Sequence, residues 1–269
     1  MKDTFIHKNA ILGNNISVGN GVTIEHDVII GNNTQIGNNV TILSGSRIGK
    51  NCQIHSNAVL GGIPQDLKYK GEYTLLEIGD NNIIREFVTI NKGTISKGKT
   101  CIGNSNLIMS NAHIGHDCII GNNCIIGNNC IIGNNCIIGF SVGIAGEVIV
   151  EDWANISGLT AIHQFSVIGE HAMISGLSRV VKDVPPYIVA AHEPLRFAGV
   201  NTVGLKRKGF NSDKIDELRA IYRVLFQEKR NTKFALESIA EKFQDTVERD
   251  KILNFVKSSK RGIIKGFEL

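Results

Sequence analysis

A six-residue period runs through two thirds of the chain. Between residues 6 and 180, twenty-seven of the thirty positions divisible by six are aliphatic, and only Asp66, Glu72 and Ser96 break the series. A small or β-branched residue often stands two positions earlier, as at Val22 and Ala58. Hexapeptide repeats of this kind are typical of a parallel β-helix, in which each unit supplies one short strand and one turn and three units complete a coil.

Two segments leave this period. Residues 61–77 contain Pro64 and several charged residues, and residues 91–101 are rich in glycine and lysine. Both segments return to the period on an isoleucine. We therefore expect two loops that project from a rigid solenoid, and loops of this kind often carry function.

The period changes after Val180. The pair Pro185-Pro186 should end the strand ladder, because proline has no N–H to donate. Apolar residues then recur at helical spacing from Ile215 to Leu225, with Ser212 as the expected N-cap, and residues 234–243 and 247–256 predict two more helices. The sequence predicts an all-β solenoid over residues 1–184 and a C-terminal α-helical domain over residues 185–269.

Targeting signals and metal motifs are not recognisable. The sequence Met1-Lys2-Asp3 leads directly into the repeat, and no apolar run is long enough to span a bilayer, so we expect a cytoplasmic protein without a membrane span. Cysteines 118, 124, 130 and 136 recur in a slot that alanine or valine fills elsewhere, which indicates small core residues. No CxxC pair occurs, so no metal site is predicted.

The chain carries a formal net charge of +4, and basic residues gather late in the sequence, at 206–208, 229–230 and 260–261. They form either a solvated face or a surface for phosphates or an acidic partner. Nucleic acid is not an expected partner, because no aromatic residues interleave the basic clusters.

One segment, Asn111 to Cys118, combines several polar side chains. Ala112 and Ile114 occupy core slots, so His113, His116 and Asp117 should point away from the core. Histidine exchanges protons near neutral pH and suits a general base, and an adjacent carboxylate can orient it. A metal site is the alternative, but a third ligand is not evident.

Several motifs resemble one family. They are QDLKY at 65–69, IRE at 84–86, VTIN at 88–91, NAHIGHD at 111–117, HQF at 163–165, DVPPY at 183–187 and GLKRKGF at 204–210. In this order they resemble the UDP-N-acetylglucosamine O-acyltransferases, which catalyse the first step of lipid A biosynthesis, and the resemblance covers essentially the whole chain. It implies a left-handed parallel β-helix, whereas general chirality rules favour right-handed crossovers. It also implies a homotrimer that moves a 3-hydroxyacyl chain from acyl carrier protein to the sugar 3-hydroxyl, with no cofactor beyond the carrier's phosphopantetheine arm.

The resemblance also implies roles for individual residues. His116 would be the general base, Asp117 would orient it, and the backbone N–H of Gly146 would stabilise the oxyanion. The remaining positions fall into three groups: sugar-nucleotide contacts at Asp66, Lys68, His113 and Gln164, contacts with the uridine and phosphate end at Asn201 and Arg207, and acyl-chain measurement at Met173 and Gly176. The basic tail would then meet the acidic carrier protein.

Three features depart from the family pattern. Asn91 and Glu147 stand at contact positions where family members often carry histidine. Residues 118–135 are three consecutive copies of Cys-Ile-Ile-Gly-Asn-Asn, about two hexapeptides more than the family has. His116 and Gly146 are therefore 30 residues apart, one coil plus two faces, where the family implies a single coil. Either twelve residues loop out, or the later half is re-phased, or the site uses different faces; the regular copies favour a continuous solenoid.

Other functions fit less of the sequence. An inactive, repeat-expanded relative of the enzyme is one alternative. The related sugar N-acyltransferases carry an extra domain before their repeats, and sugar O-acetyltransferases usually lack the QDLKY and HQF motifs. A γ-class carbonic anhydrase needs three convergent histidines for zinc, and an ice-binding solenoid needs a flat, threonine-rich face.

Overall fold

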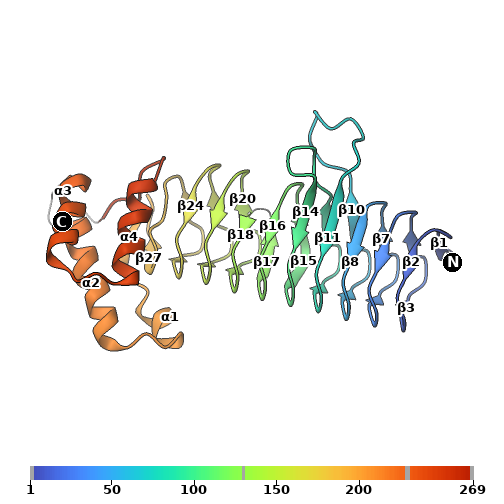
Figure 1. Ribbon diagram of the computed structural model, residues 1–269, viewed down its shortest axis with the longest axis horizontal. Helices are drawn as coiled ribbons and strands as arrows, with labels where there is room; N and C mark the ends of the chain where they lie inside the picture. Colours follow the sequence, from blue (N-terminus) through green and yellow to red (C-terminus); the bar gives the residue numbers. More distant parts are fainter. Residues whose placement is uncertain (1–2, 129–130, 228–230, 267–269) are drawn as a thin grey trace. The chain divides into compact units, whose positions relative to one another are not determined.

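The computed structural model describes residues 3–128, 131–227 and 231–266 (Figure 1). The chain forms two compact units, Met1–Ser141 and Val142–Leu269. The strands of the first unit are β1 Phe5–Ile6, β2 Ile11–Leu12, β3 Ser17–Val18, β4 Thr23–Ile24, β5 Ile29–Ile30, β6 Gln35–Ile36, β7 Thr41–Ile42, β8 Ser46–Ile48, β9 Gln53–Ile54, β10 Val59–Gly62, β11 Leu75–Ile78, β12 Ile83–Ile84, β13 Thr89–Asn91, β14 Lys99–Ile102, β15 Leu107–Ile114, β16 Ile119–Ile120, β17 Ile125–Asn128, β18 Ile131–Ile132 and β19 Ile137–Ile138.

The strands of the first unit pair in parallel with a regular register. Ile6 lies opposite Ile24, and Ile24 lies opposite Ile42, so in this regular part each strand pairs with the one 18 residues later. The side chains of Ile24 and Ile42 are fully buried, as the six-residue period predicts. The prediction of parallel hexapeptide-repeat strands around an aliphatic core is confirmed.

The corners between strands explain the Gly-Asn-Asn sequences. The glycine is not the residue that adopts the left-handed conformation. The residue with left-handed φ is the second asparagine, such as Asn15 at 57° and Asn33 at 59°. Glycine is needed at Gly13 because a Cβ there would lie 2.7 Å from the backbone nitrogen of Asn32 on the next strand level. Close approach of neighbouring corners therefore selects glycine, and asparagine tolerates the left-handed turn.

Two loops interrupt the first unit where the period breaks, and both project from the strands (Figure 1). Ile48 pairs with Ile78, so residues 63–74 are accommodated outside the ladder between β10 and β11. Ile78 pairs with Ile102, and residues 92–98 form the second loop between β13 and β14. Both loops are shorter than the predicted segments 61–77 and 91–101, because the flanking strands extend into them.

The repeated Cys-Ile-Ile-Gly-Asn-Asn segment has a different register. Ile120 pairs with Ile132, an offset of twelve residues in place of 18. Identical hexapeptides put the same residue types into the same slots at any multiple of six, so the sequence specifies this register only weakly. Cys124 and Cys136 are buried in the core as predicted, whereas Cys130 lies outside the described residues.

The second unit continues the repeat and then changes to helices. Its strands are β20 Gly143–Ile144, β21 Ile149–Val150, β22 Asn155–Ile156, β23 Ala161–Ile162, β24 Val167–Ile168, β25 Met173–Ile174, β26 Arg179–Val180, β27 Ile188–Ala191 and β28 Arg196–Val200. Parallel pairing continues past the two prolines, because β27 still pairs with β25, and β28 then pairs antiparallel with β27. The ladder therefore runs one strand further than Pro185 and Pro186 suggested.

Four helices follow: α1 Thr202–Arg207, α2 Ser212–Gln227, α3 Thr232–Lys242 and α4 Val247–Ser258. The three predicted helices are confirmed as α2, α3 and α4, whereas the sequence did not reveal α1. The cap of α2 is Asn211, not Ser212, because the Asn211 side chain accepts the N–H of Lys214 at 2.9 Å. The ring of Tyr222 on α2 is fully buried and stacks on Phe197 of β28, which fixes the helix against the strands.

Candidate active site

The central pair of the candidate site is His116 and Asp117, in the turn after β15. Ile114 is fully buried, so the next residues turn outward, and Asp117 adopts a left-handed φ of 62° that aspartate tolerates. His116 Nδ1 lies 3.0 Å from Asp117 Oδ2. This contact occupies one ring nitrogen and leaves Nε2 for a substrate.

Thr94, in the loop 92–98, holds the Asp117 carboxylate from the other side. The Thr94 backbone N–H donates to Oδ1 at 2.8 Å, and its hydroxyl donates to Oδ2 at 2.6 Å. Burial raises the pKa of the Asp117 carboxyl, but the hydrogen bonds from Thr94 and His116 outweigh it, so the pKa lies below its usual value of 3.8. Asp117 is therefore an ionised, oriented acceptor at neutral pH.

Thr94 is a site residue that the motifs did not reveal. Its Cα lies in a loop that sequence periodicity marks only as a departure from the repeat, and 23 residues separate it from Asp117. The one signal was that this loop interrupts an otherwise regular ladder just before the histidine segment.

His113 lies on β15, one residue before the buried Ile114. Its Nδ1 is 2.8 Å from the hydroxyl of Thr89 on the neighbouring strand β13. Burial, followed by the nearby charge of His116, lowers the pKa of His113. The structure thus brings His113 and His116 together, and it keeps His113 mainly neutral at neutral pH.

Asp66 and Lys68, two predicted sugar-nucleotide contacts, lie in the loop 63–74. Asp66 is half-buried, and its Oδ1 accepts the backbone N–H of Lys68 at 2.9 Å. The Lys68 side chain is exposed. Asn91, at the end of β13, is buried, and its amide donates to the carbonyl oxygen of Ile63 at the start of this loop.

In the second unit, the structure brings Gly146 and Gln164 together. Gly146 lies in the exposed turn after β20, and its carbonyl accepts the N–H of Phe165. A Cβ at Gly146 would lie 3.7 Å from the amide nitrogen of Gln164. His116 belongs to the first unit and Gly146 to the second, so their pairing in one site stays a prediction.

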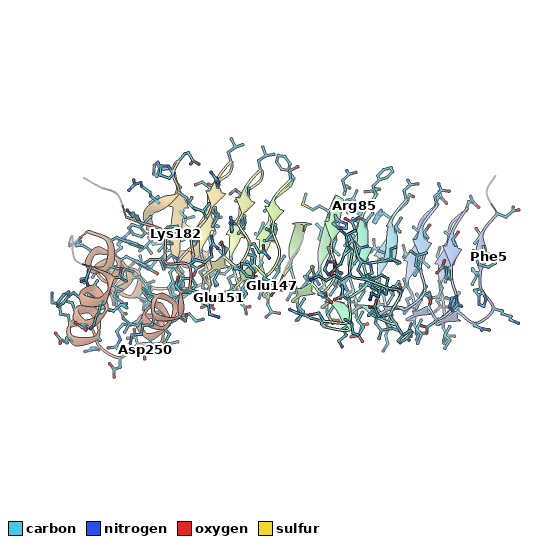
Figure 2. All side chains as sticks on the ribbon, turned by 90° about the horizontal axis from the view of Figure 1, so that it is seen from above. Phe5, Arg85, Glu147, Glu151, Lys182 and Asp250 are labelled. Carbon is cyan, nitrogen blue, oxygen red and sulfur yellow. The ribbon has the colours of Figure 1, made fainter. Side chains whose placement is uncertain are left out.

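Glu147 and Glu151 come from successive turns of the second unit (Figure 2). Glu147 is exposed and has a left-handed φ of 58°. Burial raises the pKa of Glu151. Both line a cavity of about 710 Å³, together with Phe165 of the HQF motif and Lys251 of α4.

Asn201 and Arg207 flank helix α1 but differ in surroundings. Asn201 is the N-cap of α1: its Oδ1 accepts the N–H of Gly204, and its amide donates to the carbonyl of His171. Its side chain therefore stabilises the fold, a role that sequence patterns did not suggest. Arg207 is exposed at the end of the helix.

Met173 and Gly176, the predicted acyl-chain positions, belong to β25 and the turn that follows it. Met173 is half-buried and Gly176 is exposed. A Cβ at Gly176 would come within 3.2 Å of the carbonyl oxygen of Gly158 on the neighbouring turn. A side chain at 176 would therefore crowd this neighbouring turn.

The described residues contain neither a metal-binding cluster nor a membrane-spanning helix. Within these residues, no group of three or more His, Cys, Asp or Glu side chains is arranged to hold a metal ion. None of the described helices combines the length and hydrophobicity that a membrane crossing requires.

Family models match both parts of the chain. The bacterial transferase hexapeptide model matches residues 27–62 and 100–133. The second domain of UDP-N-acetylglucosamine O-acyltransferase matches residues 183–264.

Curated relatives and solved structures agree with these matches. The acyl-[acyl-carrier-protein]--UDP-N-acetylglucosamine O-acyltransferase of Burkholderia mallei is 39% identical over 213 residues, 77% of each chain. The corresponding protein of Thiobacillus denitrificans is 38% identical over 207 residues, 77% of this chain and 76% of the relative. The crystal structure of a UDP-N-acetylglucosamine acyltransferase from Bacteroides fragilis superimposes with a TM-score of 0.81 at 44% identity, over 97% of this chain and 98% of that one.

These similarities do not favour an inactive relative, a sugar N-acyltransferase or an O-acetyltransferase. They extend over the repeat, both loops and the helices, as the motifs predicted. The chain belongs to the family of UDP-N-acetylglucosamine O-acyltransferases.

Proposed function

We propose that the chain transfers a 3-hydroxyacyl group from acyl carrier protein to the 3-hydroxyl of UDP-N-acetylglucosamine, the first step of lipid A biosynthesis. Family membership supports the reaction, and one local observation supports its mechanism. That observation is the His116–Asp117 pair, in which Thr94 holds the carboxylate through two hydrogen bonds.

His116 Nε2 takes the proton of the sugar hydroxyl as its oxygen attacks the thioester carbonyl carbon. Asp117 stabilises the imidazolium that results, because it stays ionised and accepts from Nδ1. The backbone N–H of Gly146 donates to the oxyanion of the tetrahedral intermediate. The intermediate then expels the carrier's phosphopantetheine thiolate, and the proton on His116 neutralises it, so no further cofactor is needed.

Sugar-nucleotide binding is assigned to Asp66, Lys68, His113 and Gln164, with Arg207 near the phosphates. The exposed guanidinium of Arg207 supports that role, because it can meet two phosphate oxygens at once. Asn201 would contribute to binding the uridine end by capping helix α1. Asn91 and Glu147 occupy the positions where family members often carry histidine.

The acyl chain would run along the surface of Met173 and Gly176. The absence of a side chain at Gly176 supports a site with room for a long chain. The basic tail after residue 204 would meet the acidic carrier protein.

We further propose a left-handed parallel β-helix over residues 1–184, a helical domain over 185–269, and a cytoplasmic homotrimer. Apolar side chains exposed on the two loops support self-association: Ile63 is 64% exposed and Ile95 is 77% exposed. Apolar side chains exposed on projecting loops are available for such an interface.

The test is an acyl-transfer assay with UDP-N-acetylglucosamine and carrier proteins that bear 3-hydroxyacyl chains of different lengths. We expect His116→Ala to lower kcat by about 10²–10⁴-fold, the usual contribution of a general base, without changing the oligomeric state. The matched control is His55→Ala, because His55 also faces a carboxylate, that of Glu86, but at another corner. Unchanged activity of His116→Ala would refute the base, and background activity of the wild-type trimer would refute the function.

A further inference from the structure

The loop 63–74 carries Asp66 and Lys68 and has little apolar surface to hold it in place. Its hydrogen bonds are mostly internal: Tyr69 N–H donates to the Asp66 carbonyl at 3.0 Å, and the Tyr69 hydroxyl donates to the Glu72 carbonyl at 3.0 Å. Ile63 and Leu67 are largely exposed. Internal bonds fix the shape of a loop but not its position, so within one protomer the two ends of the loop hold it against the strands.

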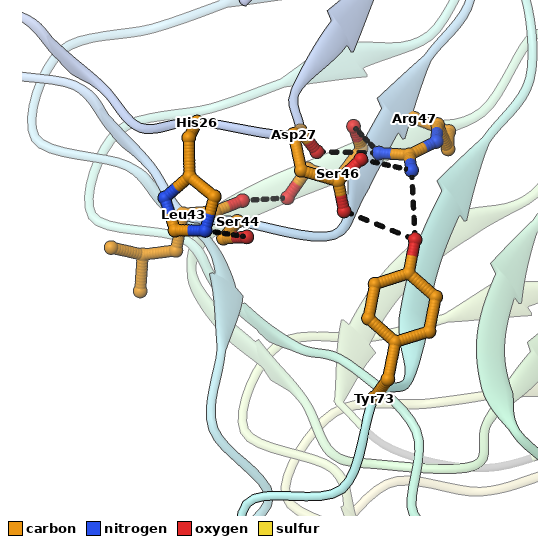
Figure 3. A network of polar contacts seen from close by, with 7 residues as sticks. All are labelled: His26, Asp27, Leu43, Ser44, Ser46, Arg47 and Tyr73. Carbon is orange, nitrogen blue, oxygen red and sulfur yellow. Dashed lines mark hydrogen bonds and ion pairs between the residues drawn. The ribbon is translucent and has the colours of Figure 1, made fainter. Parts of the chain in front are cut away.

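At its carboxyl end the loop is held by the hydroxyl of Tyr73 (Figure 3). This hydroxyl donates to Asp27 Oδ2 at 3.0 Å and accepts from Arg47 Nη2 at 3.2 Å. Tyr73 as a whole residue is 73% exposed, so its hydroxyl is what ties it to the strands. The two partners of the hydroxyl, Asp27 and Arg47, are charged, and hydrogen bonds to charged groups are stronger than those between neutral groups.

The partners of Tyr73 are fixed independently of the loop. Arg47, on β8, donates to Asp27 Oδ1 at 2.6 Å and also to the Asp27 backbone carbonyl. Asp27 occupies a corner with a left-handed φ of 55°, and its carbonyl also accepts the N–H of Gly45. This ion pair bridges two strand levels of the rigid ladder and presents a preformed receptor for a hydroxyl group.

At its amino end the loop is held by Asn91. The Asn91 amide donates to the Ile63 carbonyl, and the neighbouring Lys92 N–H donates to the Gly62 carbonyl at 2.9 Å. Asn91 is only 7% exposed, and its Oδ1 has no partner among the described residues. Burying an oxygen without a hydrogen-bond partner costs free energy. The bond from the Asn91 amide to the loop offsets this cost.

The two loops are also joined to the candidate base. Gly93 N–H donates to the Leu75 carbonyl at 3.1 Å, and a Cβ at Gly93 would lie 2.4 Å from the Lys99 nitrogen, so only glycine fits this junction. The next residue, Thr94, holds Asp117. The hydrogen bonds of Gly93 and Thr94 therefore connect the strand that follows the loop 63–74 to the carboxylate beside His116.

We propose that Tyr73 and Asn91 are positioning residues that fasten the two ends of the loop 63–74 and so set where Asp66 and Lys68 meet the sugar nucleotide. This inference rests on the proposed function for its ligand. The anchoring itself depends only on the contacts in the first unit.

The test combines a structural measurement with kinetics on Tyr73→Phe, which keeps the ring and removes only the hydroxyl. Trypsin can cut after the exposed Lys68 and Lys70 when the loop opens, so the cleavage rate reports the open population. The Tyr73 hydroxyl makes two hydrogen bonds, both to charged groups, so the loss of one neutral bond sets the lower bound of the effect. We expect cleavage at least about fivefold faster and KM for UDP-N-acetylglucosamine at least about fivefold higher, with kcat within about twofold.

Tyr69→Phe is the matched control for cleavage, because the hydroxyl it removes bonds to the Glu72 carbonyl within the loop and leaves both loop ends anchored, so its cleavage rate should stay near that of the wild type. Asn91→Leu is the variant for the other end and should reproduce the KM effect. Cleavage of Tyr73→Phe at the wild-type rate would overturn the anchor, and faster cleavage with an unchanged KM would overturn the positioning role. If the wild-type protein does not use UDP-N-acetylglucosamine, the proposed function fails, whereas the trypsin result still decides the anchor.

Discussion

Replacing Thr94 with valine tests how the candidate base is oriented. Valine has nearly the same shape but lacks the hydroxyl that donates to Asp117 Oδ2 at 2.6 Å, and the backbone N–H bond to Oδ1 remains. The Thr94 residue is 7% exposed, and the Asp117 side chain is 15% exposed, so water cannot readily replace the lost donor. A hydrogen bond to a charged group contributes about 1.5–3 kcal/mol, and we expect a loss of this size in the free energy of unfolding at pH 7.

The kinetic effect should fall on kcat. With one donor gone, the Asp117 carboxylate can rotate, and His116 loses its fixed partner, so we expect kcat to fall about tenfold, equivalent to about 1.4 kcal/mol. KM for the sugar nucleotide should change little, because the Thr94 hydroxyl donates to Asp117 and accepts the N–H of Ser96, neither of which is assigned to sugar binding. The pKa of Asp117 should rise toward its usual value, because one of the hydrogen bonds that lower it is lost.

The sign of the stability change with pH follows from the same contacts. Because the folded-state pKa of Asp117 lies below 3.8, its ionised form stabilises the fold above that pH, and this contribution is lost as the pH falls through the folded value. Thr94→Val should therefore unfold in acid at a higher pH than the wild type.

Thr100→Val is the matched control. Thr100 is fully buried, and its hydroxyl has no partner among the described residues, so the same substitution should be neutral or should stabilise by about 1 kcal/mol. Thr94→Ser should restore kcat. If Thr94→Val keeps both the kcat and the acid unfolding midpoint of the wild type, the argument that Thr94 orients the base through Asp117 is wrong.

Two further predictions concern stability. Burial lowers the pKa of His171; the charges of Lys251 and Lys208 also lower it, whereas that of Glu170 raises it. The unfolded chain therefore binds a proton more readily than the folded protein does, and stability falls as the pH drops below 6.5. His171→Phe should retain the stacking on Trp153 and Tyr187 but flatten the decrease in Tm between about pH 7 and 5, whereas the exposed His26→Phe should keep the wild-type slope; equal slopes would contradict this. Cys136 fills a core slot that valine takes at Val142 and Val148. In urea unfolding, Cys136→Val should lower the free energy of unfolding by less than about 1.5 kcal/mol, whereas Cys136→Leu, which overpacks the slot, should lower it by about 1–3 kcal/mol. A larger cost for valine than for leucine would show that the slot is not filled as the repeat implies.

Local patterns in the sequence predicted most of the architecture. A period of six specifies which side chain enters the core at each step, and the structure buries Ile24, Ile42 and Ile90 accordingly. Helical spacing located α2, α3 and α4, whereas α1 is too short to show a period. The cap of α2 was misplaced by one residue, since Asn211 and Ser212 are both good caps and only the hydrogen bond distinguishes them.

The candidate site was predictable only where its residues are neighbours in the chain. His113, His116 and Asp117 lie within five residues, and their outward direction followed from the core position of Ile114. Thr94 was missed because it meets Asp117 across 23 residues, through a loop with no period of its own. The structural role of Asn201 as the cap of α1 was missed for the same reason, as that helix was not predicted.

The register of the three Cys-Ile-Ile-Gly-Asn-Asn copies shows where sequence information ends. Copies that are identical offer the same core residues at every offset of six, so the sequence alone does not choose between twelve and 18, and the structure pairs Ile120 with Ile132. The same holds for the loop 63–74, whose anchors on Asp27, Arg47 and Asn91 come from distant strands. The sequence by itself determined the repeat, the buried positions and the histidine–aspartate pair, because each depends on residues a few positions apart. Only the tertiary structure decided the register and the partners of the loops, because those depend on hydrogen bonds between groups that meet after the chain has folded.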